Sequence, residues 1–88
     1  MFYVYAIQSQ QDNRIYVGMT GDVTHRLHEH NLGKTQSTAF YRPWRLVYTE
    51  QALNRVEARK REIWLKSGVG KEYLKNWLRS STDRIDVS

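Results

Sequence analysis

The stretch that decides the fold is RIYVGMTGDVTHRLHEH, which covers residues 14–30. Its first six residues are typical of a strand, because they include β-branched and aromatic side chains. Residues 2–8, FYVYAIQ, are almost continuously apolar and predict a central strand that is covered on both faces. The polar SQQDN between the two runs predicts a loop, so the chain begins with an antiparallel hairpin.

A helix is expected directly after this hairpin. Thr20 or Asp22 can cap its N-terminus, and the helix should end near Asn31 or Leu32. Gly33 stands where the glycine that ends a helix is expected. The helix carries three histidines and an arginine, which is a high density of side chains that can bind anions or transfer protons.

The remaining elements complete a small α+β domain. A third strand is predicted over residues 44–51, and two further helices over residues 52–67 and 71–79. A hairpin alone is marginally stable, so these elements must complete the core. The expected fold is a three-stranded antiparallel sheet flanked by helices in the order ββαβαα. The domain should cover residues 1–80, with a flexible tail over 81–88.

The composition limits the classes of protein that suit this chain. Its 88 residues allow one domain with a single modest core. No apolar run approaches the length of about 18 residues that spans a bilayer, and the N-terminus does not resemble a signal peptide. Cysteine is absent, which excludes disulfides and thiolate metal sites. A cytoplasmic location without a membrane partner is therefore the expectation.

The positive charge is concentrated in the second half of the chain. The net charge is +5, and residues 51–88 carry nine basic and five acidic side chains. A basic half suits a polyanionic partner, most simply nucleic acid. A solvated helical face in a basic protein explains the charge equally well, so charge alone does not identify the partner.

The register of the hairpin decides which tyrosines meet. Directly opposed residues of an antiparallel pair have position numbers with a constant sum. A sum of 21 places Tyr5 opposite Tyr16, whereas a sum of 25 places Tyr5 opposite Thr20 and Tyr16 opposite Ser9. The loop sequence leaves both registers open.

Two side chains of the first helix should join these tyrosines. Arg26 and His30 are four residues apart, so they lie on one face of the helix. Gly18 allows the backbone to leave the sheet tightly, or a ligand to approach closely. Tyr5, Tyr16, Arg26 and His30 could therefore surround one hollow.

The second helix offers two carboxylates to this hollow. Glu57 and Glu62 are five residues apart, which separates them by about 140° around the helix. This spacing argues against a two-metal site on that helix, and it allows one carboxylate to face the hollow while the other faces solvent. The apolar side of this helix should contain Val56, Ile63 and Trp64.

The histidines raise the alternative of a zinc site. The side chains of His25, His28 and His30 spread over about 140° or more around the helix, which is unsuited to a shared metal ion. His25 and His28 are better explained as surface or DNA-facing residues.

Five segments together resemble the GIY-YIG nuclease family. They are YVY at 3–5, YVG at 16–18, TGDVTHRL at 20–27, HEHNLG at 28–33, and EARKRE at 57–62 followed by Lys66 and SGVGK at 67–71. The resemblance covers roughly residues 2–79 and is closest to the small single-domain bacterial branch. That branch is similar to the N-terminal nuclease domain of a DNA-repair excinuclease and to the nuclease domain of certain homing endonucleases.

The resemblance implies a phosphodiesterase that hydrolyses DNA with one divalent cation, Mg²⁺ or Mn²⁺. Tyr5 and Tyr16 correspond to the two motif tyrosines, Arg26 would stabilise the transition state, and His30 would assist proton transfer. Glu62 would hold the metal. The first motif lacks the glycine of the family. Larger members also carry an asparagine after the glutamate helix, for which Asn76 is a poor match, and a shift of one turn would replace Glu62 by Glu57.

A tyrosine base needs help, because its reference pKa is about 10. A nearby cation, or proton transfer to His30, would provide that help. Tyr16 is favoured as the base over Tyr5, since it lies closer in sequence to the helix that carries Arg26 and His30.

Phosphate contacts are predicted for six basic residues, Arg26, Lys34, Arg42, Arg45, Lys60 and Lys66.

The predicted function is a DNA endonuclease with low sequence specificity or with strand or structure specificity. Single-stranded, duplex and branched DNA, and RNA, remain open as substrates. The alternatives are a non-catalytic nucleic-acid-binding module and a protein-interaction domain for an acidic partner. A monomer or weak dimer is expected, with a partner protein as one means of targeting.

Overall fold

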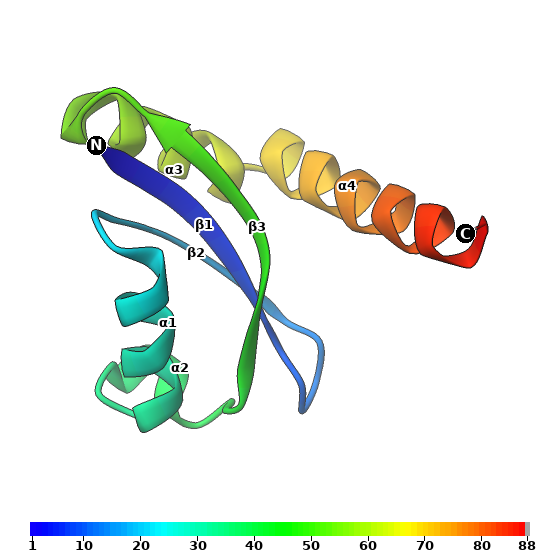
Figure 1. Cartoon of the computed structure of the whole chain (residues 1–88), viewed down its shortest axis with the longest axis horizontal. Coiled ribbons are helices and arrows are strands. Elements are labelled where there is room, and N and C mark those ends of the chain that lie inside the picture. Colours follow the sequence, from blue (N-terminus) through cyan, green and yellow to red (C-terminus); the bar gives the residue numbers. More distant parts are fainter. Residues whose placement is uncertain (88) are drawn as a thin grey trace.

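The computed structural model describes residues 1–87, with side chains up to residue 80. The elements are β1 (Phe2–Ser9), β2 (Ile15–Thr20), α1 (Val23–Leu32), α2 (Gln36–Ala39), β3 (Trp44–Ala52), α3 (Arg55–Lys66) and α4 (Gly68–Val87) (Figure 1). The predicted α+β order ββαβαα is confirmed, and the short helix α2 is an addition to it.

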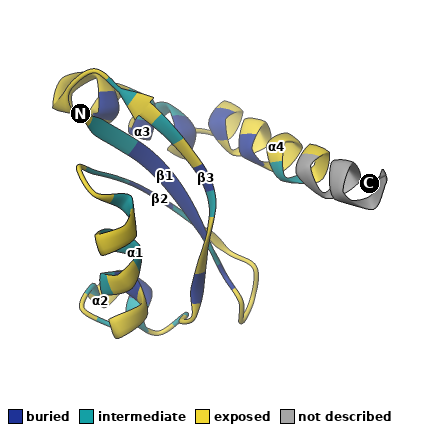
Figure 2. Cartoon of the chain, in the orientation of Figure 1, coloured by how far each residue is buried: buried dark blue, intermediate teal, exposed yellow. Residues whose placement is uncertain are grey.

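The three strands form an antiparallel sheet in the order β2-β1-β3, which makes β1 the central strand. Four consecutive residues of β1, Val4 to Ile7, are buried (Figure 2). Val4 and Ala6 pack on one face of the sheet with residues of α3 and α4. Tyr5 and Ile7 pack on the other face with α1 and the start of β3. The continuous apolar run in β1 is therefore explained by helices on both faces.

The hairpin register differs from both predicted registers. Tyr5 lies opposite Gly18, and Tyr16 lies opposite Ile7. The amide of Ser9 donates to the carbonyl of Arg14 at 2.9 Å, which closes the loop between the two strands. Each predicted register was wrong by one residue pair, because neither placed the loop between Ser9 and Arg14. Tyr5 and Tyr16 nevertheless share a face, as diagonal neighbours.

Helix α1 has the predicted ends. The side chain of Asp22 accepts a hydrogen bond from the amide of His25 at 3.0 Å, so Asp22 rather than Thr20 is the N-cap. Gly33 follows the helix in the left-handed conformation, with φ of 83°. These two ends fix which residues of α1 face the sheet.

Helix α3 buries a different face from the predicted one. Its buried residues are Ala58, Glu62 and Leu65, whereas Val56 and Ile63 are exposed. The 58–62–65 spacing places the buried residues on one stripe of the helix. The small side chain of Ala58 lets the helix pack closely on the sheet. A glutamate thus lies on the buried face, which simple apolar patterning does not predict.

The last helix begins three residues earlier than predicted, at Gly68. A side chain at Gly70 would come within 2.1 Å of the carbonyl oxygen of Trp64, so this glycine allows α4 to start close against α3. The predicted flexible tail over 81–88 lies outside the residues whose side chains are described, and it stays a prediction. Within the described residues, no helix has the length and apolar character needed to cross a membrane.

Candidate active site

A chain of three buried polar side chains lies between the sheet and helices α1 and α2. The hydroxyl of Tyr5 lies 2.8 Å from Nε2 of His30, and Nδ1 of His30 lies 2.8 Å from Oγ1 of Thr38. His30 is 0% exposed, and Tyr5 and Thr38 are 1% exposed. The sequence predicted Tyr5 and His30 for the site but not Thr38.

The hydrogen bonds of Thr38 fix the direction of this chain. Its hydroxyl donates to the carbonyl of Thr35 at 3.3 Å, so its oxygen accepts from Nδ1 of His30. Nε2 of His30 then carries no proton and accepts from the hydroxyl of Tyr5. His30 is therefore held as a neutral imidazole whose free lone pair points at Tyr5.

The pKa values agree with neutral groups in this chain. Burial lowers the pKa of His30, and the charge of Arg26 lowers it further. Burial raises the pKa of Tyr5 to about 12, although Arg26 opposes this shift through a hydrogen bond and through its charge. Both groups are neutral near pH 7, which suits a buried hydrogen-bonded pair.

Contacts with Trp44, at the start of β3, hold Thr38 in place. The indole nitrogen of Trp44 donates to the carbonyl of Thr38 at 2.8 Å. The amide nitrogen of Trp44 donates to the side chain of Asn31 at 2.6 Å, and that side chain returns a bond to the Trp44 carbonyl at 3.0 Å. These contacts join the end of α1 to the start of β3. Polar residues 34–38 carry no sequence signal that would have identified Thr38.

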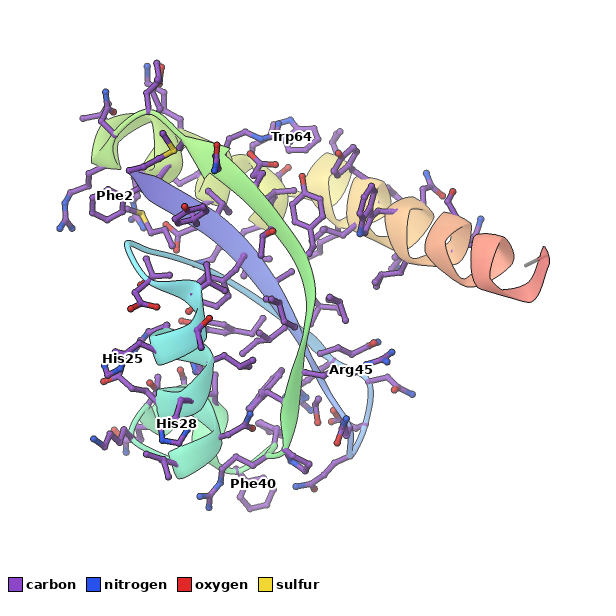
Figure 3. The ribbon with its side chains drawn as sticks, viewed as in Figure 1. Phe2, His25, His28, Phe40, Arg45 and Trp64 are labelled. Atoms are coloured by element: carbon purple, nitrogen blue, oxygen red, sulfur yellow. The ribbon has the colours of Figure 1, made fainter. Side chains whose placement is uncertain are left out.

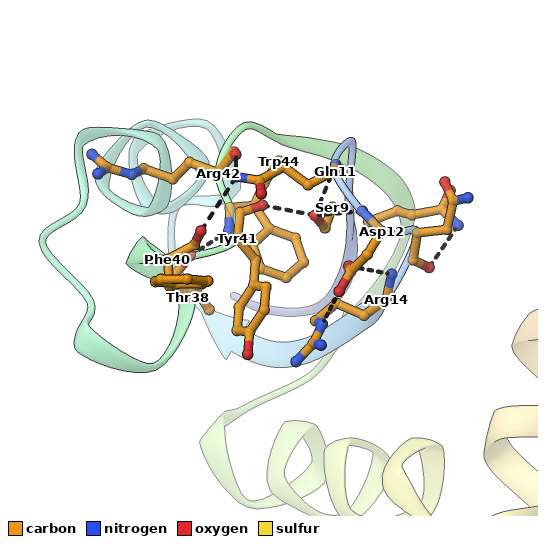
Figure 4. A network of polar contacts seen from close by, with 11 residues as sticks. Ser9, Gln11, Asp12, Arg14, Thr38, Phe40, Tyr41, Arg42 and Trp44 are labelled. Atoms are coloured by element: carbon orange, nitrogen blue, oxygen red, sulfur yellow. Dashed lines mark hydrogen bonds and ion pairs between the residues drawn. The ribbon is translucent and has the colours of Figure 1, made fainter.

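A second network fastens the segment between α2 and β3 to the β1–β2 hairpin (Figure 4). The hydroxyl of Ser9 donates to the carbonyl of Tyr41 at 2.7 Å, and the side chain of Gln11 donates to the carbonyl of Arg42. The guanidinium of Arg14 lies 3.5 Å from the ring centroid of Tyr41. The hairpin loop thereby supports the segment that presents Thr38 to His30.

Tyr16 occupies a more open position than Tyr5. It is half-buried, and its ring meets the ring of His30 edge-on at 5.2 Å and that of Trp44 at 6.4 Å. The predicted grouping of both tyrosines with His30 is thus present. Tyr16 lies at the outer side of this group and Tyr5 at its buried side.

Gly18 is the residue that makes room for Tyr5. A Cβ atom at position 18 would lie 2.6 Å from the hydroxyl oxygen of Tyr5, a distance that real Cβ contacts do not show. The sequence suggested that Gly18 allows a tight exit of the backbone from the sheet or the close approach of a ligand. In the structure, this glycine allows the close approach of a side chain of the neighbouring strand.

Arg26 links the buried chain to solvent. Its side chain is 32% exposed and interacts with the hydroxyl of Tyr5 and, at 3.1 Å, with Oε1 of Glu29. The same contact with Arg26 lowers the pKa of Glu29. An exposed guanidinium with a single, partly exposed carboxylate partner can exchange that partner for a phosphate.

Glu62 supplies a carboxylate from α3. Its side chain is 8% exposed, and its two oxygens bind Arg59 at 2.7 Å and Lys66 at 3.1 Å. Its charge is the smallest of the causes that act on the pKa of Tyr5, and it raises that pKa. Glu57 is exposed and pairs with Lys60 at 3.4 Å. Glu62 is therefore the buried carboxylate of the two and Glu57 the exposed one, and that Glu62 faces the tyrosine group stays a prediction.

The donor set fits a cation that is shared with a substrate. Among the described residues, no group of three His, Cys, Asp or Glu side chains is placed to hold a metal ion. Mg²⁺ usually keeps several waters and takes one or two carboxylates together with substrate phosphates. Glu62 can serve as such a carboxylate, if a cation replaces Arg59 and Lys66 as its partner.

The other predicted residues lie farther from this centre. His25 and His28 are exposed on α1, and Arg45 projects from β3 on the side away from α1 (Figure 3). Of the six basic residues predicted to contact phosphate, Arg26 and Lys66 contact residues of the site. The remaining four are exposed elsewhere on the surface, Lys34, Arg42, Arg45 and Lys60.

Comparison with known proteins identifies the family of this chain. The GIY-YIG catalytic domain family matches residues 1–82. The chain belongs to the GIY-YIG family. It is similar to a UPF0213 protein of Staphylococcus haemolyticus, with 38% identity over 83% of this chain and 89% of the relative. A UPF0213 protein of Desulfotalea psychrophila is 37% identical over 74% of this chain and 60% of the relative. No solved structure matches the chain significantly.

The family match covers the whole of the candidate site. The matched region includes every element that contributes to the site, from β1 to α3. The family is one of nucleases, and its domain implies binding of nucleic acid. The names of these relatives state no activity.

Proposed function

We propose that this GIY-YIG protein is a metal-dependent endonuclease that hydrolyses phosphodiester bonds in DNA. The observation that supports the proposal most strongly is the grouping of four side chains from three elements, together with a buried glutamate on α3. Tyr5 of β1, Tyr16 of β2, and Arg26 and His30 of α1 are in mutual contact or share a partner, and Glu62 of α3 is electrostatically coupled to Tyr5.

Arg26 would bind the reacting phosphate. Its planar group of donors suits non-bridging phosphate oxygens, and its present partner Glu29 is partly exposed. Positive charge at this place stabilises the charge that develops in the transition state. The contact with Tyr5 orients the guanidinium, so Arg26 presents its donors from a fixed position.

Tyr16 is our candidate for the group that accepts a proton from the attacking water. It is half-buried and can meet a substrate, whereas Tyr5 is 1% exposed and already bonded to His30. Tyr5 and His30 would act through Arg26 and through their contact with Tyr16, as positioning residues. Tyr16 therefore remains the preferred base, now because a substrate can reach it rather than because of its place in the sequence.

Glu62 would hold the divalent cation, Mg²⁺ or Mn²⁺. A bound cation supplies Lewis-acid stabilisation of the phosphate and of the leaving oxygen. Arg59 and Lys66 hold the Glu62 carboxylate in place before a cation binds. Phosphate contacts by Arg26 and Lys66 would carry no sequence information, which suits weak sequence preference.

The test compares Glu62→Ala with its matched control Glu57→Ala. Labelled single-stranded, duplex, flap and junction DNA, and an RNA strand, are incubated with each protein in Mg²⁺, in Mn²⁺ and in EDTA. We expect cleavage by the wild type that EDTA abolishes. Glu62→Ala should lower the rate by at least about 100-fold, since metal stabilisation is worth several kcal/mol. Glu57→Ala should leave the rate within about twofold, because Glu57 lies on the solvent side.

Two outcomes would contradict the proposal. Binding of the oligonucleotides without metal-dependent cleavage would favour a non-catalytic nucleic-acid-binding module on the same fold. Equal loss of activity in Glu62→Ala and Glu57→Ala would show that neither carboxylate has the special role proposed for Glu62.

A further inference from the structure

A groove lies between the outer strand β2 and helices α3 and α4, beside the candidate active site. Its volume is about 450 Å³, within the roughly 300–1,000 Å³ of typical ligand sites. Ile15 and Val17 of β2 form part of its apolar floor, together with Leu74 of α4. Strand β2 lies at the edge of the three-stranded sheet, so in the described part of the chain its outer edge is not paired with another strand.

The groove and the candidate active site have residues in common. Tyr16, our proposed base, belongs to its lining. Lys66 also belongs to the lining, and its ammonium binds Glu62 at 3.1 Å. A polymer bound at Arg26 and Glu62 could therefore extend around the edge of β2 into the groove.

Every charged residue in the lining is basic, namely Arg14, Lys66, Lys71 and Lys75. The acidic partners of Arg14, Lys66 and Lys75 lie outside the lining, and the side chains of the Lys75–Glu72 pair, 4.0 Å apart, are mostly exposed. Exposed ion pairs of this kind are weak and can be exchanged for a phosphate. An apolar floor with a basic rim matches a nucleotide, whose base is flat and apolar on its faces and whose phosphate is anionic.

We propose that this groove receives a nucleotide of the substrate strand that flanks the reacting phosphate. The base lies against Ile15 and Leu74, and the flanking phosphates lie against Lys71 and Lys75. This proposal rests on the proposed nucleic-acid substrate, and it adds the path that the strand follows away from the reaction centre.

The first experiment tests the basic rim with Lys71→Glu and the matched control Arg55→Glu. Both residues are exposed in the first turn of a helix, and each substitution changes the charge equally. Binding of a fluorescein-labelled oligothymidylate is measured by anisotropy in EDTA, over a series of salt concentrations. Lys71→Glu should raise Kd at least about tenfold and reduce the salt slope by about one. Arg55→Glu should raise Kd by less than about threefold. Equal effects of the two substitutions would overturn the proposal.

The second experiment tests the floor with Ile15→Asn and the matched control Ile63→Asn, two isoleucines that are partly exposed. The probes are oligothymidylate and an oligomer of the same length built from abasic tetrahydrofuran units. Ile15→Asn should weaken binding of oligothymidylate about fivefold and leave binding of the abasic strand unchanged. Ile63→Asn should change neither. If Ile15→Asn does not fold, Ile15→Thr retains the strand preference and replaces it. A floor variant with no effect, or with equal effects on both probes, would overturn the proposal.

These measurements separate the groove from the nuclease proposal, because they need no turnover. If the wild type cleaves DNA and Lys71→Glu and Arg55→Glu have equal effects on binding, the groove proposal is contradicted and the nuclease proposal stands. If no cleavage occurs but binding changes as expected, the nuclease proposal is contradicted and the groove is supported as a nucleotide site.

Discussion

The two faces of the sheet each carry a cluster of tyrosine, arginine and glutamate, but the clusters differ in how completely their polar groups are paired. On the α1 face, Arg26 contacts Glu29 through one nitrogen and is also bonded to Tyr5. On the α3 face, Arg61 binds Glu50 through two nitrogens, at 2.6 and 3.1 Å. The same residue types therefore make an adaptable site on one face and a closed structural contact on the other.

The α3-face cluster is satisfied from within. The hydroxyl of Tyr48 donates to Glu50, and the guanidinium of Arg61 lies 4.4 Å from the ring centroid of Trp64. Burial and the bond to Glu50 raise the pKa of Tyr48. The hydrogen bond to Glu50 also raises the pKa of Arg61. Both Glu50 oxygens are engaged, so the polar groups of this cluster are committed to one another rather than to a ligand.

The α1-face cluster shows the opposite arrangement. Its buried end, Tyr5, His30 and Thr38, is fully paired, while its outer end consists of the partly exposed Arg26 and the half-buried Tyr16. A rigid buried end and an accessible outer end are what a binding site for a reacting group requires. The comparison teaches that pairing and exposure, rather than residue type, distinguish the two clusters.

Within the two clusters, the largest expected effect comes from replacing each arginine with lysine. Arg26→Lys keeps the charge but loses the planar donor group, and should lower kcat by at least about 30-fold with little change in stability. Arg61→Lys should destabilise the protein by about 1 kcal/mol, since its pair with Glu50 is partly exposed, and should leave kcat unchanged. Oligonucleotide cleavage and urea unfolding measure the two effects. A loss of kcat in Arg61→Lys as large as in Arg26→Lys would contradict the distinction between a site on the α1 face and a structural contact on the α3 face.

A smaller effect is expected from adding one methyl group next to Tyr5. Gly18→Ala places a Cβ against the Tyr5 hydroxyl and should cost about 1–3 kcal/mol by overpacking. The displaced Tyr5 should also reduce activity, because it positions Arg26. Gly21→Ala is the control, since no described residue other than its two chain neighbours has an atom within 4 Å of its Cβ position. Thermal unfolding and cleavage assays should show a loss in Gly18→Ala alone. Equal stability of the two variants would contradict the close contact.

The smallest effect concerns the pH dependence of stability. Because the pKa of His30 is lowered in the folded protein, the unfolded chain binds a proton first as the pH falls. The contribution of neutral His30 is therefore present above about pH 6.5, the unfolded value, and is lost as the pH falls toward the lower folded value. Urea unfolding between pH 7.5 and 5 should show a steeper loss of stability in the wild type than in His30→Gln.

His28→Gln is the control for this experiment, because His28 is exposed on α1. This variant should follow the wild-type pH dependence. If His30→Gln and His28→Gln have the same pH dependence, the buried neutral state of His30 is wrong.

Much of the local structure could be predicted from the sequence. The central strand, the end of α1 at Gly33, and the order of the elements follow from apolar runs, glycine placement and polar loops. The carboxylate that faces inward could be narrowed to Glu57 or Glu62, because helix geometry separates them. The spacing of Tyr5, Tyr16, Arg26, His30 and Glu62 was sufficient to suggest the family that the comparison then confirmed.

Other features depend on contacts between segments that are distant in the sequence. The hairpin register required the loop to close between Ser9 and Arg14, and that bond has no reliable signal in the polar residues around it. Thr38 meets His30 only because the segment after α2 is tied to the hairpin loop and to Trp44. The buried face of α3 was set by the close approach of Ala58 rather than by the larger apolar residues.

The sequence by itself determined the elements, their order and the residue types available for chemistry, because these depend on local propensities and on spacing along one strand or helix. The tertiary structure decided which of the polar groups are paired, buried or exposed. It placed Gly18 against Tyr5, and it turned Glu62 inward. These outcomes depend on packing between elements, where a shift of one residue or a rotation of one helix exchanges a buried side chain for an exposed one.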